Sequence, residues 1–569
     1  MLVLSLLVGL CTGFMAVILQ KGIHFIQSML SPLVEKNSLW SLALPSVGML
    51  FSLLLLRYVV KDDIGHGVTK VLQAISRNDS RIKPHNMISS VVTSVLTIGF
   101  GGSVGAEAPI VYTGAAIGSN FARAGKLSYR NVTVLVGCGA AAAIAGIFKA
   151  PLAGMLFTLE ILFFNISLTS IMPMMVATVS AAVVSYLFNG FNPAFECSLE
   201  PFMLHNIPFY ILLGIAGGFM SLYFTRTTLK LEDVFGKMSS PWLKWLLCSI
   251  GVGLLVFLFP PLLGEGYGDI TLLLTGQGGE LDASPLSFLS SNSWGLLLLF
   301  ALVMFFKVVS MTLTNAGGGV GGTFGPTLFV GAIMGFVVVG VLNNCFADRF
   351  WTLPVQNFVL VGMAALMAGV MQAPMTSIFL IAEMTGGYDL FLPLILSCVV
   401  SFGVTRIWEH YSIYTKRLAQ KGELLTHDSD QAALTLMKTS DLVRDKYPRL
   451  DLDADIDEIM TIVSKSTAAV FPVVGKDGIF QGLVEMDDIR KIIPDLSRHR
   501  DIHTYNLMKQ PLDYVYRDEK MSSVIDKFER TEAWRLPVID EQHHYLGFIS
   551  KSRILAAYRE SLRSISVED

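Results

Sequence analysis

A single acidic residue, Glu107, stands in the glycine-rich stretch GGSVGAEAPI (101–110), between two apolar stretches. A carboxylate at membrane depth costs about 2.5–3.5 kcal/mol or more, so it is rarely kept without a use. A helix N-terminus carries free N–H donors and a partial positive charge, and glycines let an anion approach them. A carboxylate at that end competes with the anion. Glu107 is therefore a candidate gate that protonation or a side-chain swing would open; the alternative is a helix-capping carboxylate near the membrane interface.

The motif recurs in the second part of the chain. GAEAP (105–109) corresponds to GTFGP (322–326), and APLAGMLFTLE (150–160) corresponds to APMTSIFLIAE (373–383), at nearly the same separation along the chain. The same order of glycine-rich turn, helix, Ala-Pro and terminal Glu predicts an internally duplicated domain. In many transporters such halves are inverted and direct interrupted helices at the substrate. Glu160 and Glu383 match across the halves, and we interpret both as structural.

Composition sets the class of protein. The chain has 569 residues, of which 52% are hydrophobic and 15% charged, and its mean hydropathy is +0.57. This balance predicts an integral membrane protein in a lipid bilayer. The net charge of −3 gives no indication of nucleic-acid binding. The six cysteines are scattered, which favours buried thiols over disulfides or a metal site. No H-E-x-x-H motif or activated nucleophile indicates an enzyme.

Apolar runs fill the chain as far as about Tyr414. The opening run MLVLSLLVGLCTGFMAVILQ is interpreted as a membrane segment rather than a signal peptide, because it lacks a basic start and continues as one long helix. Further candidate spans are 41–60, 133–163, 168–188, 241–263, 294–313 and 389–405. Helices near 104–122 and 320–340 start abruptly after Gly-Gly turns. Such starts are tolerated inside a membrane only beside protein or a water-filled cavity.

From about Lys438 onward the chain alternates amphipathic helices with short strands. FPVVGKDGIFQGLVEMDDI (471–489) resembles LPVIDEQHHYLGFISKSRI (536–554), and GKDG fits a hairpin turn. These features predict a soluble α/β tandem repeat of about 60 residues per copy.

These motifs resemble those of the CLC family of chloride channels and chloride/proton antiporters with a C-terminal pair of CBS modules. GAEAP resembles the family motif G-[KR]-E-G-P, whose glutamate is the gate, here Glu107. GGTFGP resembles G-x-F-x-P, whose backbone amides, here at Thr323 and Phe324, hold the central anion. SIYTKR resembles the segment with the pore tyrosine, here Tyr414, with Tyr411 as the competing candidate. The resemblance also implies anion contacts from Ala106, Ala108 and the backbone of Gly65, His66 and Gly67.

Three departures bear on the expected activity. Ala106 and Ala108 replace a basic residue and a glycine of the gate motif, and GHGVT (65–69) replaces G-S-G-x-P. His66 thus stands where a serine hydroxyl contacts the ion; the alternative is that its ring points away. Familiar antiporters have a second acid directly after the Glu160 position, and here that residue is Ile161, as in the channel branch. Lys149 is either a pore charge or a snorkelling interfacial residue.

The tail resembles CBS modules that bind adenine nucleotides through G-x-x-[ST]-x-x-[DN]. The first copy, GLVEMDD, supplies Asp488 as a possible ribose contact, and the second, GFISKSR, supplies Ser550. Neither copy is complete, so the alternative is a dimerisation platform without a ligand. No other cofactor is expected.

The expected fold is an all-α polytopic membrane protein with duplicated, inverted halves, followed by a soluble α/β CBS pair. The expected domains are a transmembrane part (1–420, halves about 1–190 and 205–405), a linker (421–437) and CBS modules at 438–497 and 503–565. The expected function is glutamate-gated passage of chloride or a similar small anion in each subunit of a homodimer, with channel-like conduction favoured. The alternatives are a chloride/proton antiporter with proton coupling and a membrane-anchored nucleotide sensor. The plasma membrane is the expected location, with the CBS modules and both termini cytoplasmic.

Overall fold

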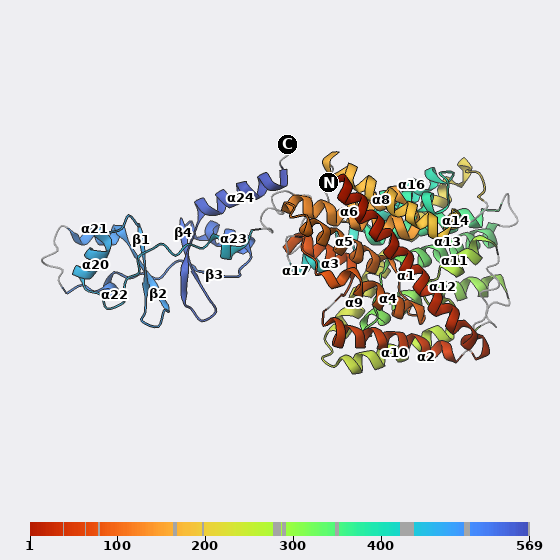
Figure 1. Ribbon diagram of the computed structural model, residues 1–569, viewed down its shortest axis with the longest axis horizontal. Coiled ribbons are helices and arrows are strands. Elements are labelled where there is room, and N and C mark those ends of the chain that lie inside the picture. The colour runs from red at the N-terminus through yellow and green to blue at the C-terminus, as the bar shows by residue number, and fades with distance from the viewer. Residues whose placement is uncertain are drawn as a thin grey trace. The chain divides into compact units, whose positions relative to one another are not determined.

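Two compact units make up the computed structural model, Met1–Glu423 and Leu424–Asp569 (Figure 1). The described residues are 1–37, 39–62, 64–77, 80–162, 168–195, 199–276, 286, 292–346, 352–421, 437–493 and 501–566. Most of the predicted linker (421–437), residues 494–497 of the first predicted module and Cys197 lie outside the described residues. The domain boundaries taken from the sequence therefore stay predictions.

The first unit is built from helices in its described part. Its α-helices are α1 (Leu2–Lys36), α2 (Trp40–Leu54), α3 (Gly67–Arg77), α4 (Ser89–Gly99), α5 (Glu107–Ala124), α6 (Tyr129–Phe148), α7 (Pro151–Ile161), α8 (Leu168–Asn189), α9 (Ile207–Gly236), α10 (Pro241–Leu258), α11 (Tyr267–Leu274), α12 (Ser293–Ala316), α13 (Phe324–Phe346), α14 (Val355–Met371), α15 (Pro374–Met384), α16 (Phe391–Trp408) and α17 (Lys416–Lys421). Short 3₁₀ or π segments are η1 (Leu55–Val60), η2 (Pro84–Met87), η3 (Leu204–Asn206) and η4 (Pro260–Leu262).

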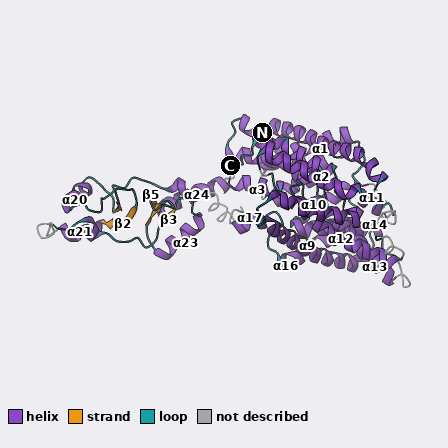
Figure 2. Ribbon diagram, turned by 90° about the horizontal axis from the view of Figure 1, so that it is seen from below, coloured by secondary structure: helices purple, strands orange, loops and turns teal. Residues whose placement is uncertain are grey.

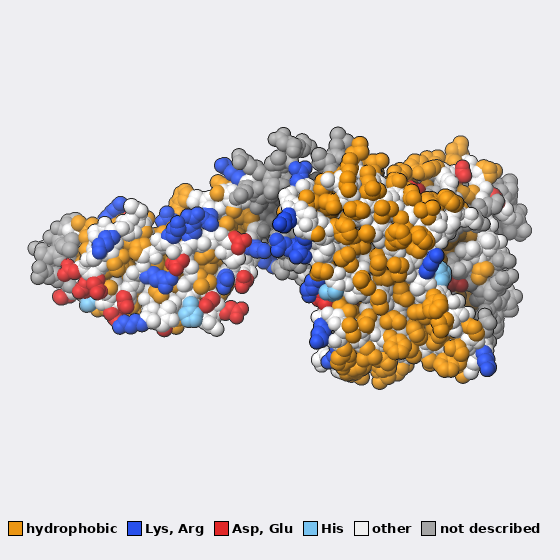
Figure 3. All heavy atoms as spheres, in the orientation of Figure 1, with side chains coloured by type: hydrophobic (Ala, Val, Ile, Leu, Met, Phe, Trp, Pro, Cys, Tyr) orange, Lys and Arg blue, Asp and Glu red, His pale blue; other side chains and the backbone are white. Residues whose placement is uncertain are grey.

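Hydrophobic side chains cover the first unit. Among the described residues, nine helices are long and apolar enough to cross a bilayer. The face in Figure 3 shows hydrophobic side chains over most of this unit, whereas charged side chains are spread over the second unit. Helices such as α2 and α10 leave most of their apolar surface outside the core. A surface of this kind requires lipid, so the chain is an integral membrane protein.

The two halves of the membrane unit are related by a local two-fold axis. Gly105 and Gly322, equivalent residues in the repeat, form an antiparallel bridge with N···O distances of 3.0 and 2.6 Å. An antiparallel bridge between equivalent residues places the start of α5 and the start of α13 in opposite directions. Equivalent residues of the two halves thus meet at the centre of the fold, as the predicted duplication implies, and the inversion of the halves stays a prediction.

A reciprocal exchange of carboxylates repeats this symmetry. Glu160, near the end of α7, accepts hydrogen bonds from the amides of Met375 and Thr376 at 3.0 and 2.7 Å. Glu383, near the end of α15, accepts hydrogen bonds from the amides of Leu152 and Ala153 at 3.1 and 2.8 Å. Each acid thus satisfies the free N–H groups at the start of the other half's helix.

Left-handed residues interrupt the helices at the same point of each half. Lys149 (φ 57°) ends α6 and Gln372 (φ 53°) ends α14, and each is followed by Ala-Pro, where α7 or α15 begins. Proline cannot continue a helix but suits the first helical position. The single span expected over 133–163 was therefore wrong, because Lys149 to Pro151 divide it into α6 and α7.

Glycines allow backbone contact between consecutive helices. A Cβ atom on Gly114 of α5 would lie 2.2 Å from the carbonyl oxygen of Gly139 of α6, and one on Gly331 of α13 would lie 2.6 Å from that of Gly362 of α14. The pairs α5–α6 and α13–α14 therefore pack more closely than any side chain would permit.

The second unit contains two hairpins with the same register. Its elements are α19 (Thr439–Leu442), α20 (Ile456–Ser464), β1 (Val470–Val474), β2 (Phe480–Glu485), α21 (Met486–Ile492), α22 (Thr504–Leu507), β3 (Val515–Tyr516), α23 (Met521–Thr531), β4 (Arg535–Ile539), β5 (Tyr545–Ser550) and α24 (Lys551–Ser566). Antiparallel pairing joins β1 to β2 and β4 to β5, with Pro472 opposite Leu483 and Pro537 opposite Phe548. In Figure 2 all strands lie in this unit. The predicted tandem α/β repeat and the hairpin turn at Gly475–Gly478 are confirmed.

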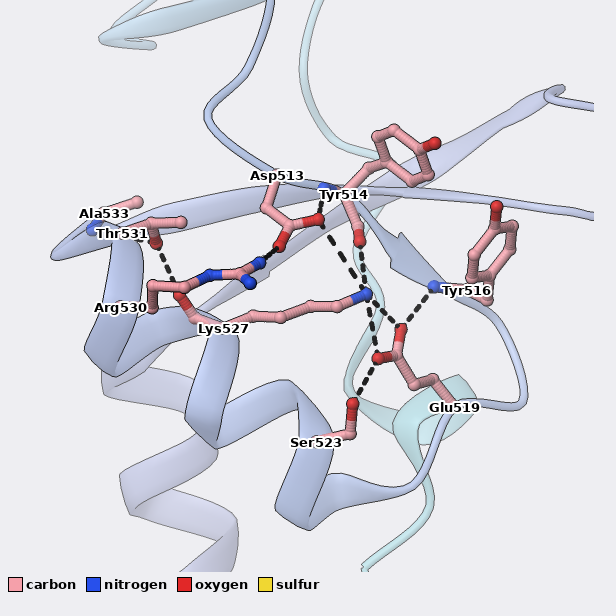
Figure 4. Close-up of polar contacts among 9 residues, drawn as sticks. All are labelled: Asp513, Tyr514, Tyr516, Glu519, Ser523, Lys527, Arg530, Thr531 and Ala533. Carbon is pink, nitrogen blue, oxygen red and sulfur yellow. Dashed lines mark hydrogen bonds and ion pairs between the residues drawn. The ribbon is translucent and has the colours of Figure 1, made fainter.

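A network of ionic and polar contacts stabilises the second copy (Figure 4). Lys527 of α23 contacts Glu519 at 2.8 Å, and Glu519 also accepts from Ser523 Oγ at 2.6 Å and from the Tyr516 amide at 3.0 Å. Burial raises the pKa of the Glu519 carboxyl, but these hydrogen bonds outweigh burial and place the pKa below its usual value. Arg530 pairs with Asp513 beside them. The network connects α23 to the segment around β3.

Candidate functional site

Three helix N-termini converge at the centre of the membrane unit. Helix α3 begins at Gly67, α5 at Glu107 and α13 at Phe324. A Cβ atom on Gly67 would lie 2.2 Å from the carbonyl oxygen of Ala108, and one on Gly322 would lie 2.8 Å from the Ala108 Cβ. The structure therefore brings together the three glycine-containing motifs singled out in the sequence. Their N-terminal amides and dipoles favour negative charge at this point.

The carboxylate of Glu107 bridges the two halves. Only 1% of Glu107 is exposed, although it is the first residue of α5. Oε2 accepts a hydrogen bond from the Gly325 amide at 3.1 Å, and Oε1 accepts one from the hydroxyl of Tyr267. An acid from the first half thus occupies an N-terminal donor of α13 in the second half. Glu107 thus contacts a helix end of the other half, which a simple cap of its own helix would not do.

Thr323, directly before α13, and Tyr414 contact each other. Thr323 Oγ1 donates to the Tyr414 hydroxyl at 3.3 Å, and both residues are buried. Thr69 Oγ1 of α3 donates to the Tyr414 carbonyl oxygen at 3.4 Å, which joins the third helix N-terminus to the same segment. Tyr411, the competing candidate, is 44% exposed.

The side chain of His66 contacts an acid. Its Nε2 atom lies 3.1 Å from Oε1 of Glu232 on α9, and Glu232 also pairs with Arg417 of α17. The imidazole is therefore part of an ionic cluster at the start of α3. Gly65, just before it, has a positive φ of 47°, so the chain turns sharply ahead of the helix.

Aromatic rings enclose the Phe324 end of the site. The ring of Phe324 stacks on Phe148 at a centroid distance of 5.4 Å and contacts Phe157 edge-on at 6.3 Å. Phe148 and Phe195 in turn contact the ring of Tyr267 at 6.4 and 6.2 Å. These rings keep the junction apolar outside the backbone donors, a condition under which electrostatic interactions are strong.

A cavity of about 980 Å³ leads to the junction from one side. Ala106, Phe148, Glu265 and Tyr267 are among the residues that line it. Lys149 also lines it, and its Nζ donates to the carbonyl oxygens of Asn189 and Asn192 at 3.3 and 2.8 Å. The cavity therefore reaches the start of α5, and a half-buried lysine lies along its wall.

Three polar residues of the site did not emerge from the sequence. Oε1 of Glu265 accepts from the Ala106 amide at 2.8 Å, Tyr267 bonds to Glu107, and Lys307 of α12 is fully buried. Signals for them were present. GEGYGDI (264–270) contains a glycine-flanked acid like that of GAEAP, and Lys307 is the one charge within the apolar run 294–313. The loop before α11, the start of α11 and helix α12 bring them to the start of α5 only in the folded chain.

Ile161 is buried at the end of α7, directly after Glu160. Glu160 is engaged with the start of α15, and Thr376 Oγ1 donates a further hydrogen bond to it at 2.6 Å. Glu160 and Glu383 thus have the structural role interpreted from the sequence, at helix ends.

In the second unit, Asp488 of α21 lies between two lysines. Its carboxylate contacts Lys491 at 2.9 Å and Lys509 at 2.5 Å, and these lysines lower the pKa of the Asp488 carboxyl. Ser550, at the end of β5, shares a hydrogen bond of 3.2 Å with Ser552. The two candidate nucleotide contacts therefore lie in the two copies of the repeat.

The described cysteines are not joined in disulfides. Of the described cysteines, Cys138, Cys248 and Cys398 are buried, Cys11 is partly buried and Cys345 is exposed, and all are free thiols. Among the described residues, His, Cys, Asp and Glu side chains form no group of three that could hold a metal ion.

Family models match both units of the chain. The model described as "Voltage gated chloride channel" matches residues 47–406, and the model described as "CBS domain" matches residues 440–495 and 500–560.

Relatives with similar sequences are named as chloride transport proteins. A putative chloride channel protein, ClcB-like, of Ralstonia nicotianae is 30% identical over 385 residues, which cover 67% of this chain and 85% of that protein. The H(+)/Cl(−) exchange transporter ClcA of Salmonella paratyphi B is 28% identical over 450 residues, which cover 76% of this chain and 90% of that protein.

Solved structures share the fold. A slow cyanobacterial Cl⁻/H⁺ antiporter has a TM-score of 0.64 and 25% identity, covering 74% of this chain and 97% of that one. A eukaryotic CLC transporter has a TM-score of 0.60 and 16% identity and covers 97% of both chains, so it shares the fold of the membrane unit and the tail.

Proposed function

The chain belongs to the voltage gated chloride channel family, and from this premise we propose that it exchanges chloride, or a similar small anion, for protons across a membrane. Glu107 is the gate of the pathway in each subunit. Its carboxylate competes with the anion for the N-terminal donors of α13, and protonation releases those donors.

One observation carries the proposal: Glu107 of the first half accepts a hydrogen bond from the Gly325 amide of the second half at 3.1 Å. A permanently ionised acid in this position would exclude other anions from α13. A proton neutralises the acid and weakens its hold on the amide, so one event admits an anion and loads a proton. Coupling of the two ions therefore needs only this residue at the junction.

Backbone and hydroxyl donors would hold the anion once Glu107 has left. The amides of Thr323 and Phe324 and the hydroxyl of Tyr414 are on one side, and the backbone around Ala106, Ala108 and Gly65–Gly67 is on the other. Neutral donors bind an anion loosely enough for it to leave again. The contact of His66 with Glu232 supports a backbone contribution from this residue rather than one from its ring.

Exchange is better supported than the channel-like conduction favoured from Ile161. The Salmonella relative is named an exchange transporter, and the cyanobacterial neighbour is an antiporter. Ile161 replaces the second acid of familiar antiporters, so in an exchanger the proton reaches Glu107 by another route than that position.

We further propose the assembly and location that the family implies. The protein is a homodimer in the plasma membrane, with one anion pathway in each subunit and with the CBS modules and both termini in the cytoplasm. The CBS pair binds an adenine nucleotide, with Asp488 toward the ribose and Ser550 toward the phosphates. Titration of ATP into the wild-type protein and the Asp488→Ala variant tests this: equal heats from both would oppose the assignment of Asp488.

The main test uses purified protein in chloride-loaded liposomes with an outward chloride gradient. Chloride efflux and internal pH are followed together for the wild type and for Glu107→Gln. Uphill proton movement driven by chloride is expected in the wild type, and chloride flux without proton movement in Glu107→Gln. Chloride efflux with no coupled protons in the wild type would restore channel-like conduction. If Glu107→Gln changed neither signal, the assignment of the gate would be wrong.

A further inference from the structure

The loop before α11 brings a second carboxylate to the end of α5. Gly264 and Gly266 have positive φ values of 64° and 91°, so the backbone turns sharply on both sides of Glu265. Oε1 of Glu265 accepts a hydrogen bond from the Ala106 amide at 2.8 Å. This amide directly precedes α5 and is one of the donors assigned above to the anion pathway. Glu265 thus occupies a donor that a passing anion would use.

Glu265 lies closer to the cavity than Glu107 does. Glu265, Tyr267 and Ala106 line the cavity, whereas Glu107 is not among its lining residues and is 1% exposed. The hydroxyl of Tyr267 donates to Glu107, so this tyrosine separates the cavity from the gate. An anion that enters from the cavity therefore meets the Glu265 carboxylate first and the Glu107 carboxylate second.

Charged side chains lie around Glu265. Glu107 and Lys307 are near enough to act on its charge in opposite directions. Lys307 Nζ is fully buried and donates to the carbonyl oxygens of Leu262 and Gly264 at 3.2 and 2.7 Å, which fixes the same loop. The other charged or titratable groups along the cavity are Lys21 and His24 of α1, Lys149 at the end of α6, and Tyr267 and Asp269 of α11.

We propose that Glu265 is a second gating carboxylate, which closes the cavity side of the pathway at the N-terminus of α5, in series with Glu107 at the N-terminus of α13. The inference rests on the proposed anion exchange and extends it by one residue. An anion passes only after both carboxylates have left their helix ends or lost their charge. The pathway consequently has two closures, one donated by the loop before α11 and one by α5 itself.

The experiment measures chloride efflux from liposomes over a series of pH values for Glu265→Gln, Glu107→Gln and the double variant. Removal of the Glu265 charge is expected to raise efflux at pH 7 about fivefold, the size of one charge effect at a helix end. Chloride efflux from Glu107→Gln alone is still expected to depend on pH, because Glu265 still titrates. Efflux from the double variant is expected to be independent of pH. All are compared in a His24→Gln background, so that the imidazole in the cavity does not contribute.

Two further variants separate occupation of the amide from cavity charge. Glu265→Asp keeps the charge but shortens the side chain, and it is expected to raise efflux as Glu265→Gln does. Asp269→Asn removes a cavity charge without freeing Ala106, and its effect is expected to be smaller. The second gate would be overturned if chloride efflux from Glu265→Asp equalled that from the wild type. It would also be overturned if Asp269→Asn raised efflux as much as Glu265→Gln does. Asp389→Asn, an exposed position away from the cavity, is the matched control for folding and reconstitution.

The outcomes distinguish a failure of the second gate from a failure of the proposed anion exchange. No chloride efflux from the wild type would refute the proposed transport itself. If the wild type and Glu107→Gln behave as expected while Glu265→Gln equals the wild type at every pH, the exchange stands and only the second gate is wrong. The second gate is also wrong if chloride efflux from the double variant equals that from Glu107→Gln at every pH.

Discussion

Two junctions between the halves of the membrane unit use the same interaction in different ways. At the start of α7 and α15, Glu160 and Glu383 each bond to the other half's helix, so the contact is made twice. At the start of α5 and α13 the two acids are not equivalent, since Glu107 of α5 bonds to the Gly325 amide and Glu265 of the loop before α11 bonds to the Ala106 amide. The residue equivalent to Glu107 in the second half is Phe324.

This difference separates a structural carboxylate from a functional one. A reciprocal pair satisfies both helix ends permanently, and neither acid can leave without exposing free amides. Acids from non-equivalent positions, as at the start of α5 and α13, can leave one helix end without the other and free a donor that another anion can use. A contact made by equivalent acids of both halves thus indicates a structural role, and a contact without such equivalence indicates the candidate functional site.

The largest expected effect comes from the reciprocal junction. Glu160→Ala removes hydrogen bonds from the Met375 amide, the Thr376 amide and the Thr376 hydroxyl, and we expect a loss of about 3 kcal/mol in the free energy of unfolding. Equilibrium unfolding in detergent measures it, with Asp389→Asn as the control. Unchanged stability with transport abolished would give Glu160 a functional role and remove the contrast.

A carboxylate outside the membrane provides a reference for a fixed acid. Glu519→Gln is expected to cost about 1.5 kcal/mol at pH 7, since Lys527, Ser523 and the Tyr516 amide bond to this carboxylate. Because the pKa of Glu519 is lowered by folding, its contribution is present above the unfolded value of about 4.3 and is lost as pH falls through the lower folded value.

The difference between the wild type and Glu519→Gln should therefore be smaller at pH 3 than at pH 7. Denaturant unfolding of the tail in the full-length protein at both pH values checks this. Glu529→Gln, an exposed acid on the same helix, is the control. A difference as large at pH 3 as at pH 7 would contradict the ionic explanation.

At the gate, Tyr267→Phe removes one of the two bonds that hold Glu107. We expect chloride efflux to rise about fivefold, the equivalent of about 1 kcal/mol for one typical hydrogen bond, without a change in the unfolding midpoint. Liposome efflux measures the rise, and Tyr388→Phe, an exposed tyrosine, is the control. Reduced efflux would mean that Tyr267 assists opening.

The smallest effect is expected for Tyr414→Phe. The bond from Thr323 to the Tyr414 hydroxyl is 3.3 Å long, and backbone amides supply the remaining donors of the proposed anion site. We expect the half-saturating chloride concentration to change by less than about twofold. A tenfold change would assign the anion site to side chains rather than to helix ends.

Much of this arrangement could be predicted because it depends on local sequence. Glycine before an acid or a phenylalanine, with a helix after it, identified the starts of α5 and α13, and the repeated order of motifs identified the duplication. The break after Lys149 was missed because hydropathy continues across it without a change. Glu265 and Lys307 were missed because they come close to the start of α5 from far along the chain, and no local pattern reports that approach.

The backbone contacts of Gly114 with Gly139 and of Gly331 with Gly362 limit what can move. Helices joined at this distance, without intervening side chains, cannot slide past each other without a steric clash. Many transporters expose their substrate to each face in turn by rocking one half against the other. Here α5 and α6 lie in one half and α13 and α14 in the other, so each pair moves as one body and any displacement between the halves falls at the contacts that join them, such as Glu107 to Gly325.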